Sequence, residues 1–396
     1  MAKQFFLFLI LVPVFFVCKS QSTELLQKKS HNPDEIKSRH ILSTPVDIRI
    51  LTRLPAVLYE SSGVVVTHPN KIWSHEDSGN ASELYCFDTT GQLLRTLVIS
   101  NVQNIDWEDL ASDNVGRIYI CDAGNNDNNR KNLAVYRIPN PETISGNTTT
   151  AEIIRFVLSD QTQFPPPQSN RNFDIEAMIW RSDTLFLFTK NRSTPINGYS
   201  KMYKLPAQPG NRTAQLVDSV YLGNSIEVAR VTAADILPQT GELVLLTARK
   251  IISFSNYPGN RFFSGDRVEY VFSTFPGQNE GLAFVTPNRL YMTEEGSGSL
   301  AGFLYEIVLP TTGGTNHLKE EPILITYPNP TKDLLTIECP WPDTTRLQIF
   351  DVQGNLLHQA TLGESRQLDV SGLNTGVYLL NLQYGQQMVT RRIIRK

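Results

Sequence analysis

The stretch that decides the fold is Asp106-Trp107-Glu108-Asp109-Leu110-Ala111, in which acidic residues are interleaved with and followed by small or apolar residues. The same pattern returns later in the chain, at Asp174-Ile175-Glu176-Ala177-Met178, Ala233-Ala234-Asp235-Ile236-Leu237 and Asn279-Glu280-Gly281-Leu282-Ala283. Self-similar segments along a chain indicate an architecture built from repeated units. We call these segments the openers, because each of them begins one repeat.

Each opener is followed by further strand-like runs that turn residues separate from one another. The second runs end in a small polar residue or cysteine and are Arg117–Cys121, Thr184–Thr189, Glu242–Thr247 and Arg289–Thr293. The third runs are Leu133–Ile138, Lys201–Leu205, Ile251–Ser255 and Gly302–Val308. A fourth run follows in every repeat except the last, as at Ile153–Leu158 and Val268–Ser273. Short alternating or β-branched runs of this kind predict an all-β protein.

An earlier copy of the repeat precedes the first opener. Its runs are Gly63–Val66, Lys71–Ser74, Glu83–Phe87 and Leu93–Ile99. Repeats of four strands predict a β-propeller, for which we favour five blades and keep six as the alternative. The last repeat lacks a fourth strand, whereas Val46–Leu51 is strand-like without an obvious partner. We expect Val46–Leu51 to pair into the last blade, because this closes the ring and removes an exposed strand edge.

The propeller is predicted to span residues 46–310, and the segments before and after it are predicted to be targeting and connecting sequence. Residues 1–20 have the basic start, apolar centre and small residues near the cleavage position that are typical of a signal peptide. The alternative is a lipoprotein signal that ends at Cys18, although bulky Val17 precedes that cysteine. Residues 21–45 are expected to form a flexible lead-in, and removal of Ser22–Thr44 is expected to cost little stability. Residues 311–322 are expected to form a linker.

The final segment, residues 323–396, alternates as short strands. It contains, in order, Tyr327-Pro328-Asn329-Pro330, Leu347-Gln348-Ile349-Phe350-Asp351-Val352-Gln353-Gly354, Leu373-Asn374-Thr375-Gly376-Val377-Tyr378-Leu379-Leu380 and Arg391-Arg392-Ile393-Ile394-Arg395-Lys396. This order resembles the type A C-terminal sorting domain of the type IX secretion system, which is found in Bacteroidota. The resemblance implies a small β-sandwich, contact with the type IX machinery, and export through the periplasm and the outer membrane to the cell surface or the medium.

The propeller segment also resembles known proteins. The motifs Ile72-Trp73-Ser74-His75-Glu76-Asp77-Ser78-Gly79, Asp106–Ala111 and Tyr119-Ile120-Cys121-Asp122-Ala123-Gly124-Asn125 are similar to poorly characterised bacterial propellers. The sequence Glu280-Gly281-Leu282-Ala283 is shared with phytase-like and esterase-like propellers. Because one fold hosts many functions, this resemblance does not by itself assign an activity.

Composition narrows the class of partner. The chain has 396 residues with 36 Lys and Arg against 39 Asp and Glu, a net charge of −3. This balance provides no basic field for nucleic acid, and no apolar run is long enough to span a bilayer as a helix. After cleavage of the signal peptide, Cys86, Cys121 and Cys339 remain, without metal-ligand spacing. Cys86 and Cys121 are expected to form either a bridge or two buried thiols.

Propeller geometry brings the start of every inner strand and the end of every second strand to one end of the ring, which we call the opener rim. The opener acids expected there are Glu108, Glu176, Asp235 and Glu280. The second-strand ends are expected to add His75, Glu76, Asp77, Asp122, Asn125, Asn126, Lys190, Arg192, Arg249, Lys250, Glu294 and Glu295. A ring of carboxylates suits calcium, which binds several oxygen ligands. Alternatively, each acid accepts backbone N–H groups of a neighbouring blade and holds the repeats together.

These residues support a function at the opener rim. The favoured hypothesis is a ligand-binding or interaction module, with or without a metal. The alternative is a calcium-dependent phosphoesterase resembling β-propeller phytase, in which His75, Lys190 and Arg249 are the candidate catalytic residues and orient the substrate. A purely structural surface protein is a third hypothesis. The sequence has no nucleophile elbow, phosphate-binding loop, zinc helix or dinucleotide motif.

Overall fold

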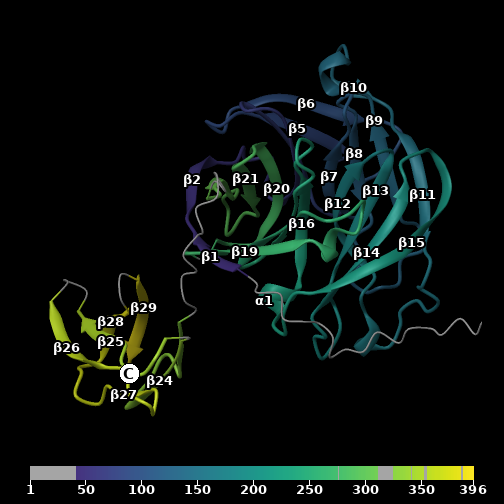
Figure 1. Cartoon of the computed structure of the whole chain (residues 1–396). Coiled ribbons are helices and arrows are strands. Elements are labelled where there is room, and N and C mark those ends of the chain that lie inside the picture. Colours follow the sequence, from purple (N-terminus) through teal and green to yellow (C-terminus); the bar gives the residue numbers. More distant parts are fainter. Residues whose placement is uncertain (1–41, 275, 311–323, 340, 352–354, 385–386) are drawn as a thin grey trace, which may run out of the picture. The chain divides into compact units, whose positions relative to one another are not determined.

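The computed structural model describes residues 42–274, 276–310, 324–339, 341–351, 355–384 and 387–396. The predicted signal peptide, the lead-in up to residue 41 and the predicted linker lie outside these residues. The described chain consists almost entirely of β-strands (Figure 1). The fold class predicted from the sequence, a β-propeller followed by a small β-sandwich, is confirmed.

The propeller strands form antiparallel meanders of four strands each. The first is β3 (Ser61–His68), β4 (Lys71–Glu76), β5 (Glu83–Phe87) and β6 (Leu93–Ile99). The second is β7 (Trp107–Ser112), β8 (Ile118–Asp122), β9 (Ala134–Ile138) and β11 (Glu152–Leu158). The third is β12 (Asp174–Arg181), β13 (Thr184–Lys190), β14 (Tyr199–Pro206) and β15 (Gly210–Tyr221).

The remaining two meanders complete the ring. The fourth is β16 (Val231–Ile236), β17 (Leu243–Thr247), β18 (Lys250–Ser255) and β19 (Asp266–Phe272). The fifth is β20 (Asn279–Thr286), β21 (Arg289–Glu294), β22 (Phe303–Val308) and β2 (Ile48–Arg53). Each inner strand contacts the next, from β3 through β7, β12, β16 and β20 back to β3. We interpret each meander as one blade.

The N-terminal strand closes the ring, as expected, because β2 pairs antiparallel with β22 of the fifth blade. Strand pairing already begins within the predicted lead-in, residues 21–45. β1 (Leu42–Val46) lies parallel to β19 of the fourth blade, so residues 42–45 belong to the propeller sheets. Other blades are also joined at their outer edges. β10 (Thr148–Thr149) pairs with β6, and the first half of β15 pairs with β11.

The core of the propeller lies between adjacent blades. Five apolar clusters each draw their residues from two neighbouring blades, including one between the fifth blade and the first. Blade strands are therefore buried on both faces and contain continuous apolar runs, as in residues 243–246 of β17. Cys86 and Cys121 are separate buried thiols, so the alternative of a bridge between them is wrong.

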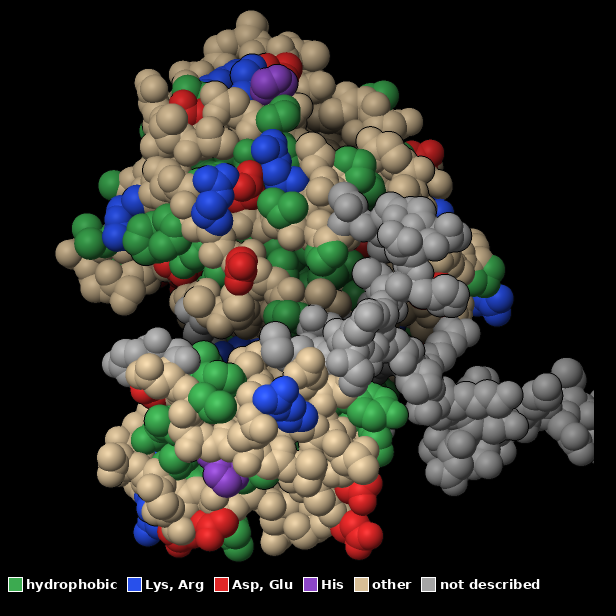
Figure 2. All heavy atoms as spheres, turned by 60° about the vertical axis from the view of Figure 1, so that its left-hand side comes forward, with side chains coloured by type: hydrophobic (Ala, Val, Ile, Leu, Met, Phe, Trp, Pro, Cys, Tyr) green, Lys and Arg blue, Asp and Glu red, His purple; other side chains and the backbone are tan. Residues whose placement is uncertain are grey.

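Helices are few and short in the described residues. They are α1 (Ile226–Ala229) and the single 3₁₀ turns Pro141–Thr143, Gln168–Asn170 and Phe262–Ser264. None of these helices could cross a membrane. On the face shown in Figure 2, acidic and basic side chains are interspersed with apolar ones.

The C-terminal segment forms a separate core from two sheets. One sheet has β23 (Ile325–Tyr327), β24 (Leu334–Glu338) and β27 (Gln367–Asp369). The other has β26 (Leu356–Thr361), β25 (Arg346–Phe350), β28 (Gly376–Tyr384) and β29 (Gln387–Arg395). Alternate residues of both sheets, such as Leu335 and Leu380, face one shared apolar cluster. This alternation is typical of a β-sandwich.

Candidate functional site at the opener rim

A β-bulge near the start of every inner strand determines which side chains lie at the opener rim. The strand register shifts there in all five inner strands. The bulged residues are Ser62 and Gly63 in β3, Glu108 and Asp109 in β7, Glu176 in β12, Thr232 in β16 and Glu280 in β20. A bulge adds an unpaired residue and redirects its side chain. Equivalent positions in three blades therefore present a glutamate at the same end of the ring.

The structure brings three of the four predicted acids together. The Lys190 Nζ lies 2.9 Å from Oε2 of Glu176 and 3.7 Å from Oε1 of Glu280, so it joins the third and fifth blades. Glu108 has a carboxylate oxygen within 4.8 Å of oxygens of both Asp174 and Glu176. Glu108, Glu176 and Glu280 thus form one buried cluster.

The fourth predicted acid, Asp235, does not belong to this cluster. It lies near the end of β16 and lines a cavity of about 850 Å³ at the opposite end of the ring. Thr232 occupies the bulge position of the fourth blade. The openers were matched on their acidic residues, so Asp235 was wrongly taken as the equivalent of Glu108, Glu176 and Glu280. Matching Val231-Thr232-Ala233 to Ile175-Glu176-Ala177, on the shared alanine, would have found the correct register.

Asp235 and Asp109 accept backbone N–H groups from other blades, which is the role that the sequence analysis gave as the alternative for the opener acids. The Asp235 carboxylate accepts the backbone N–H of Ile236 and, at 2.7 Å, that of Phe284 in the fifth blade. Asp109, which the sequence analysis did not single out, is completely buried. Its carboxylate accepts N–H groups from its own blade and from the third and fourth blades. These aspartates hold inner strands together and leave the glutamates available for another role.

Part of the rim is a saturated ion-pair network. Asp174 accepts hydrogen bonds from Arg192 Nε, at 2.5 Å, and from the Asn125 backbone N–H. Arg192 Nη2 also lies 2.9 Å from Glu176. Burial opposes ionisation of Glu176, but Lys190 and Arg192 outweigh it and lower the pKa of Glu176. Burial and the charge of Glu176 raise the pKa of Asp174. Bound cationic side chains therefore already neutralise this half of the cluster.

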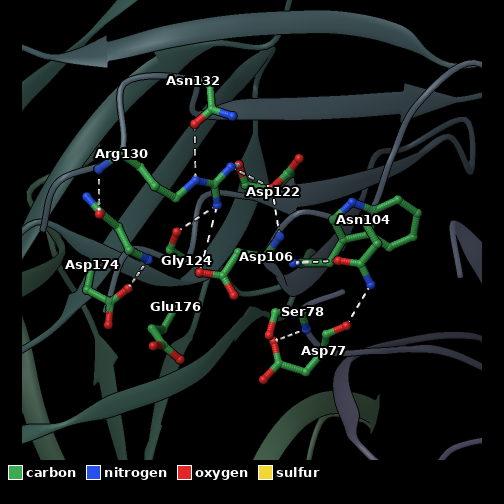
Figure 3. Close-up of polar contacts among 12 residues, drawn as sticks. Asp77, Ser78, Asn104, Asp106, Asp122, Gly124, Arg130, Asn132, Asp174 and Glu176 are labelled. Atoms are coloured by element: carbon green, nitrogen blue, oxygen red, sulfur yellow. Dashed lines mark hydrogen bonds and ion pairs between the residues drawn. The ribbon is translucent and has the colours of Figure 1, made fainter. Parts of the chain in front are cut away.

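A second carboxylate group on the rim is not neutralised in this way. Asp77, Asp106 and Glu108 offer oxygens that all lie within 4.8 Å of one another. Figure 3 shows Asp77 and Asp106 directed toward the same space as Glu176. Arg130 lies 3.9 Å from the Asp106 carboxylate, and among the described residues the Asp77 carboxylate accepts a hydrogen bond only from the nearby Ser78 N–H. Burial raises the pKa of both aspartates to about 6.

Glu108 is the most deeply buried acid of this group. Its side chain is 6% exposed, and within the described residues no hydrogen bond or ion pair reaches its carboxylate. Burial, followed by repulsion from Glu176 and Asp77, raises the pKa of Glu108. A Cβ on Gly124 would lie 2.0 Å from Glu108 Oε1, so only glycine lets this backbone approach the carboxylate so closely. In Glu280, which is 5% exposed, Oε2 likewise has no hydrogen-bond partner in the part of the chain described.

The three candidate catalytic residues lie in different surroundings. His75 is completely buried, its Nδ1 is 2.9 Å from the Glu76 carbonyl oxygen, and its ring packs edge-on against Trp107. Burial lowers its pKa to about 4. Arg249 follows β17 and is exposed. Lys190 does lie in the cluster, although Glu176 and Glu280 engage its ammonium group.

Asp235 should make stability depend on pH. Burial raises the pKa of Asp235 to about 7 from an ordinary value of 3.8. Between these values the folded chain retains a proton that the unfolded chain has released, so this contribution to stability is present at pH 4 and is lost as the pH approaches 7. We expect Asp235→Asn to show a smaller fall in melting temperature between pH 4.5 and 7.5 than the wild type. Thermal denaturation at both pH values measures this, and equal falls would contradict the assignment.

Comparison with known proteins identifies the C-terminal segment. Residues 326–396 match the secretion system C-terminal sorting domain. This domain directs export by the type IX secretion system, so the chain reaches the cell surface or is secreted. No curated protein matches the chain.

Several solved structures are similar to the chain at low sequence identity. PorZ, a surface component of the type IX secretion system of Porphyromonas gingivalis, is 12% identical with a TM-score of 0.33, over 85% of this chain and 45% of PorZ. The chain thus spans less than half the length of PorZ. A gluconolactonase from Xanthomonas campestris is 14% identical with a TM-score of 0.34, over 63% of this chain and 72% of that enzyme. The extracellular domain of BT4673 from B. thetaiotaomicron is 10% identical with a TM-score of 0.33, over 88% of this chain and 59% of that one.

Proposed function

We propose that this exported propeller is a ligand-binding module whose site is the opener rim, and that a hard divalent cation such as calcium forms part of the site. The observation that carries the proposal is the Glu108 carboxylate, which is buried beside Asp77 and Asp106 without a hydrogen bond or ion pair among the described residues. An ionised carboxylate in such a place is costly unless a positive charge compensates it. A cation shared by these three acids would supply that charge.

Calcium suits the donors that are present. It prefers carboxylate oxygens, tolerates irregular geometry and binds more oxygens than three carboxylates supply. The remaining positions would be open to water or to oxygens of a ligand. Asp77 follows β4 of the first blade, whereas Asp106 and Glu108 belong to the second, so a shared ion would also connect two blades.

The acids of the third blade are the poorer metal ligands. Asp174 and Glu176 also lie close to Glu108, but Arg192 and Lys190 occupy their oxygens. A metal ion would have to displace two cations that are held at ion-pair distance. The group of Asp77, Asp106 and Glu108 is therefore the site we propose.

The arrangement supports binding over the alternative of a calcium-dependent phosphoesterase. In that alternative His75, Lys190 and Arg249 act on a substrate beside the metal. His75 is completely buried within the inter-blade packing, and the ammonium of Lys190 is engaged by two glutamates. A residue must reach the reacting group before its pKa matters for catalysis. His75 does not meet this condition, and the ammonium group of Lys190 is already held by Glu176 and Glu280.

Calcium should stabilise the wild-type chain, and Glu108→Gln should abolish this effect. A ligand at about 100 times its dissociation constant adds about 2.7 kcal/mol of stability. Without calcium we expect Glu108→Gln to melt at or above the wild-type temperature, because the substitution removes the cost of ionising a buried carboxyl group beside other carboxylates. With calcium only the wild type should gain. Thermal denaturation in chelator and in millimolar calcium measures both effects.

The control for this experiment is Glu227→Gln, which changes an exposed glutamate on α1. It should retain the full calcium response. A calcium response that persists in Glu108→Gln would contradict the proposed ligand set. The absence of a response in the wild type would contradict the calcium site itself.

A further inference from the structure

The fourth blade differs from its neighbours at the opener rim. Where the second, third and fifth blades carry a glutamate at the bulge, the fourth carries Thr232, whose hydroxyl donates to the Asn279 carbonyl oxygen at 2.9 Å. Arg230 lies two residues earlier and pairs with Lys190 by an isolated β-bridge. This part of the rim, which we call the fourth-blade sector, thus has a threonine in place of a glutamate and an arginine two residues away.

Arg230 is incompletely compensated. Its Nε donates to the Asn191 carbonyl oxygen at 3.1 Å, and its side chain is half-buried. Among the described residues no carboxylate lies within ion-pair distance of its guanidinium. The neighbouring Arg192 differs, because Asp174 and Glu176 bind it on two sides. Burial, and then the positive charge of Arg192, lower the pKa of Arg230.

We infer that Arg230 forms an oxyanion subsite of the opener rim, so that the ligand carries a carboxylate or phosphate group bound in the fourth-blade sector. The inference rests on the proposed ligand-binding function of the rim. It adds that the ligand is negatively charged. The guanidinium is planar and offers paired N–H donors that match both kinds of oxyanion. Nε donates to Asn191, and the described residues provide no further hydrogen bond to this guanidinium, so its two terminal nitrogens would bind the ligand.

The cation site and the oxyanion subsite should act together. Without a metal ion, the carboxylates of the rim repel an anion that approaches Arg230. A calcium ion bound to Asp77, Asp106 and Glu108 removes much of this repulsion. Coupling between two binding sites is reciprocal, so the anion must strengthen calcium binding by the factor by which calcium strengthens anion binding. We expect a factor of about five or more, the usual lower range of such coupling.

Isothermal titration of the purified chain with calcium, alone and with either inorganic phosphate or acetate, tests the inference. Phosphate concentrations are kept below those at which calcium phosphate forms. We expect at least one of the two anions to tighten calcium binding by about fivefold, and the comparison shows which chemistry the subsite prefers. Arg230→Gln should bind calcium alone as well as or better than the wild type, and should lose the effect of the anion.

Two further variants keep the test decisive. Arg261→Gln removes an exposed arginine of the same blade and should keep the anion effect. Arg230→Lys should fold even if the glutamine variant does not, and should keep part of the effect because it retains the charge. Calcium binding that neither anion changes would overturn the inference and leave the cation site intact. The absence of calcium binding would instead refute the proposed function, and an anion effect that survives in Arg230→Gln would place the subsite elsewhere.

Discussion

Replacing Asp109 with alanine is expected to destabilise the propeller by about 3 to 5 kcal/mol, because it leaves buried backbone donors of three blades without an acceptor. One carboxylate oxygen accepts the Leu110 N–H at 2.8 Å. The other accepts the N–H of Met178 in the third blade, at 2.8 Å, and that of Ala234 in the fourth, at 3.2 Å. No other single side chain described at the centre of the ring accepts N–H groups from three blades.

Chemical denaturation of the wild type, Asp109→Ala and Asp109→Asn measures this effect. An asparagine side chain has only one acceptor oxygen, so the stability of Asp109→Asn should lie between those of the other two proteins. Asp127→Ala, which alters an exposed aspartate of the same blade, should change stability by no more than about 0.5 kcal/mol. If Asp109→Ala were as stable as this control, the role of Asp109 in holding the blades together would be refuted.

Shortening the chain from its N-terminus should reduce stability in two steps. A chain that begins at residue 41 keeps both N-terminal strands and should be as stable as one with the whole lead-in. A chain that begins at Asp47 loses β1 and exposes the edge of β19. A chain that begins at Leu54 also loses β2, so the fifth blade lacks its outer strand and the ring is no longer closed by strand pairing. We expect this last chain to fail to fold cooperatively.

Circular dichroism melts of the three chains test this order. The expected step on loss of β1 differs from the prediction from sequence that Ser22–Thr44 is dispensable, because residues 42–44 lie in β1. β1 places Val46 in the apolar cluster between the fourth and fifth blades and pairs through all five of its residues. Equal melting temperatures for the chains that begin at Leu54 and at residue 41 would contradict closure of the ring by β2.

Local patterns were sufficient to predict the strands and their grouping. Each blade strand is a short β-branched or apolar run between turns, and both properties act within a few residues. The repeated openers then implied a ring, because a blade can bury its two faces only against other blades. The missing fourth strand of the last repeat predicted the pairing of β2 with β22, since an unpaired edge is unfavourable. The C-terminal sorting domain was recognised from its sequence for a different reason, namely the order of its motifs.

The sequence by itself therefore determined the fold class, the export domain and the region of the candidate site, because strand periodicity and turn chemistry are local properties. Only the tertiary structure decided which acids meet. The bulges direct Glu108, Glu176 and Glu280 into one cluster, whereas a shift of three residues along β16 puts Thr232 there and Asp235 at the opposite end of the ring. Whether a carboxylate holds blades together, pairs with Lys190 or stays unpaired depends on groups supplied by other blades. Contacts between residues far apart in sequence set that environment, and no local pattern encodes them.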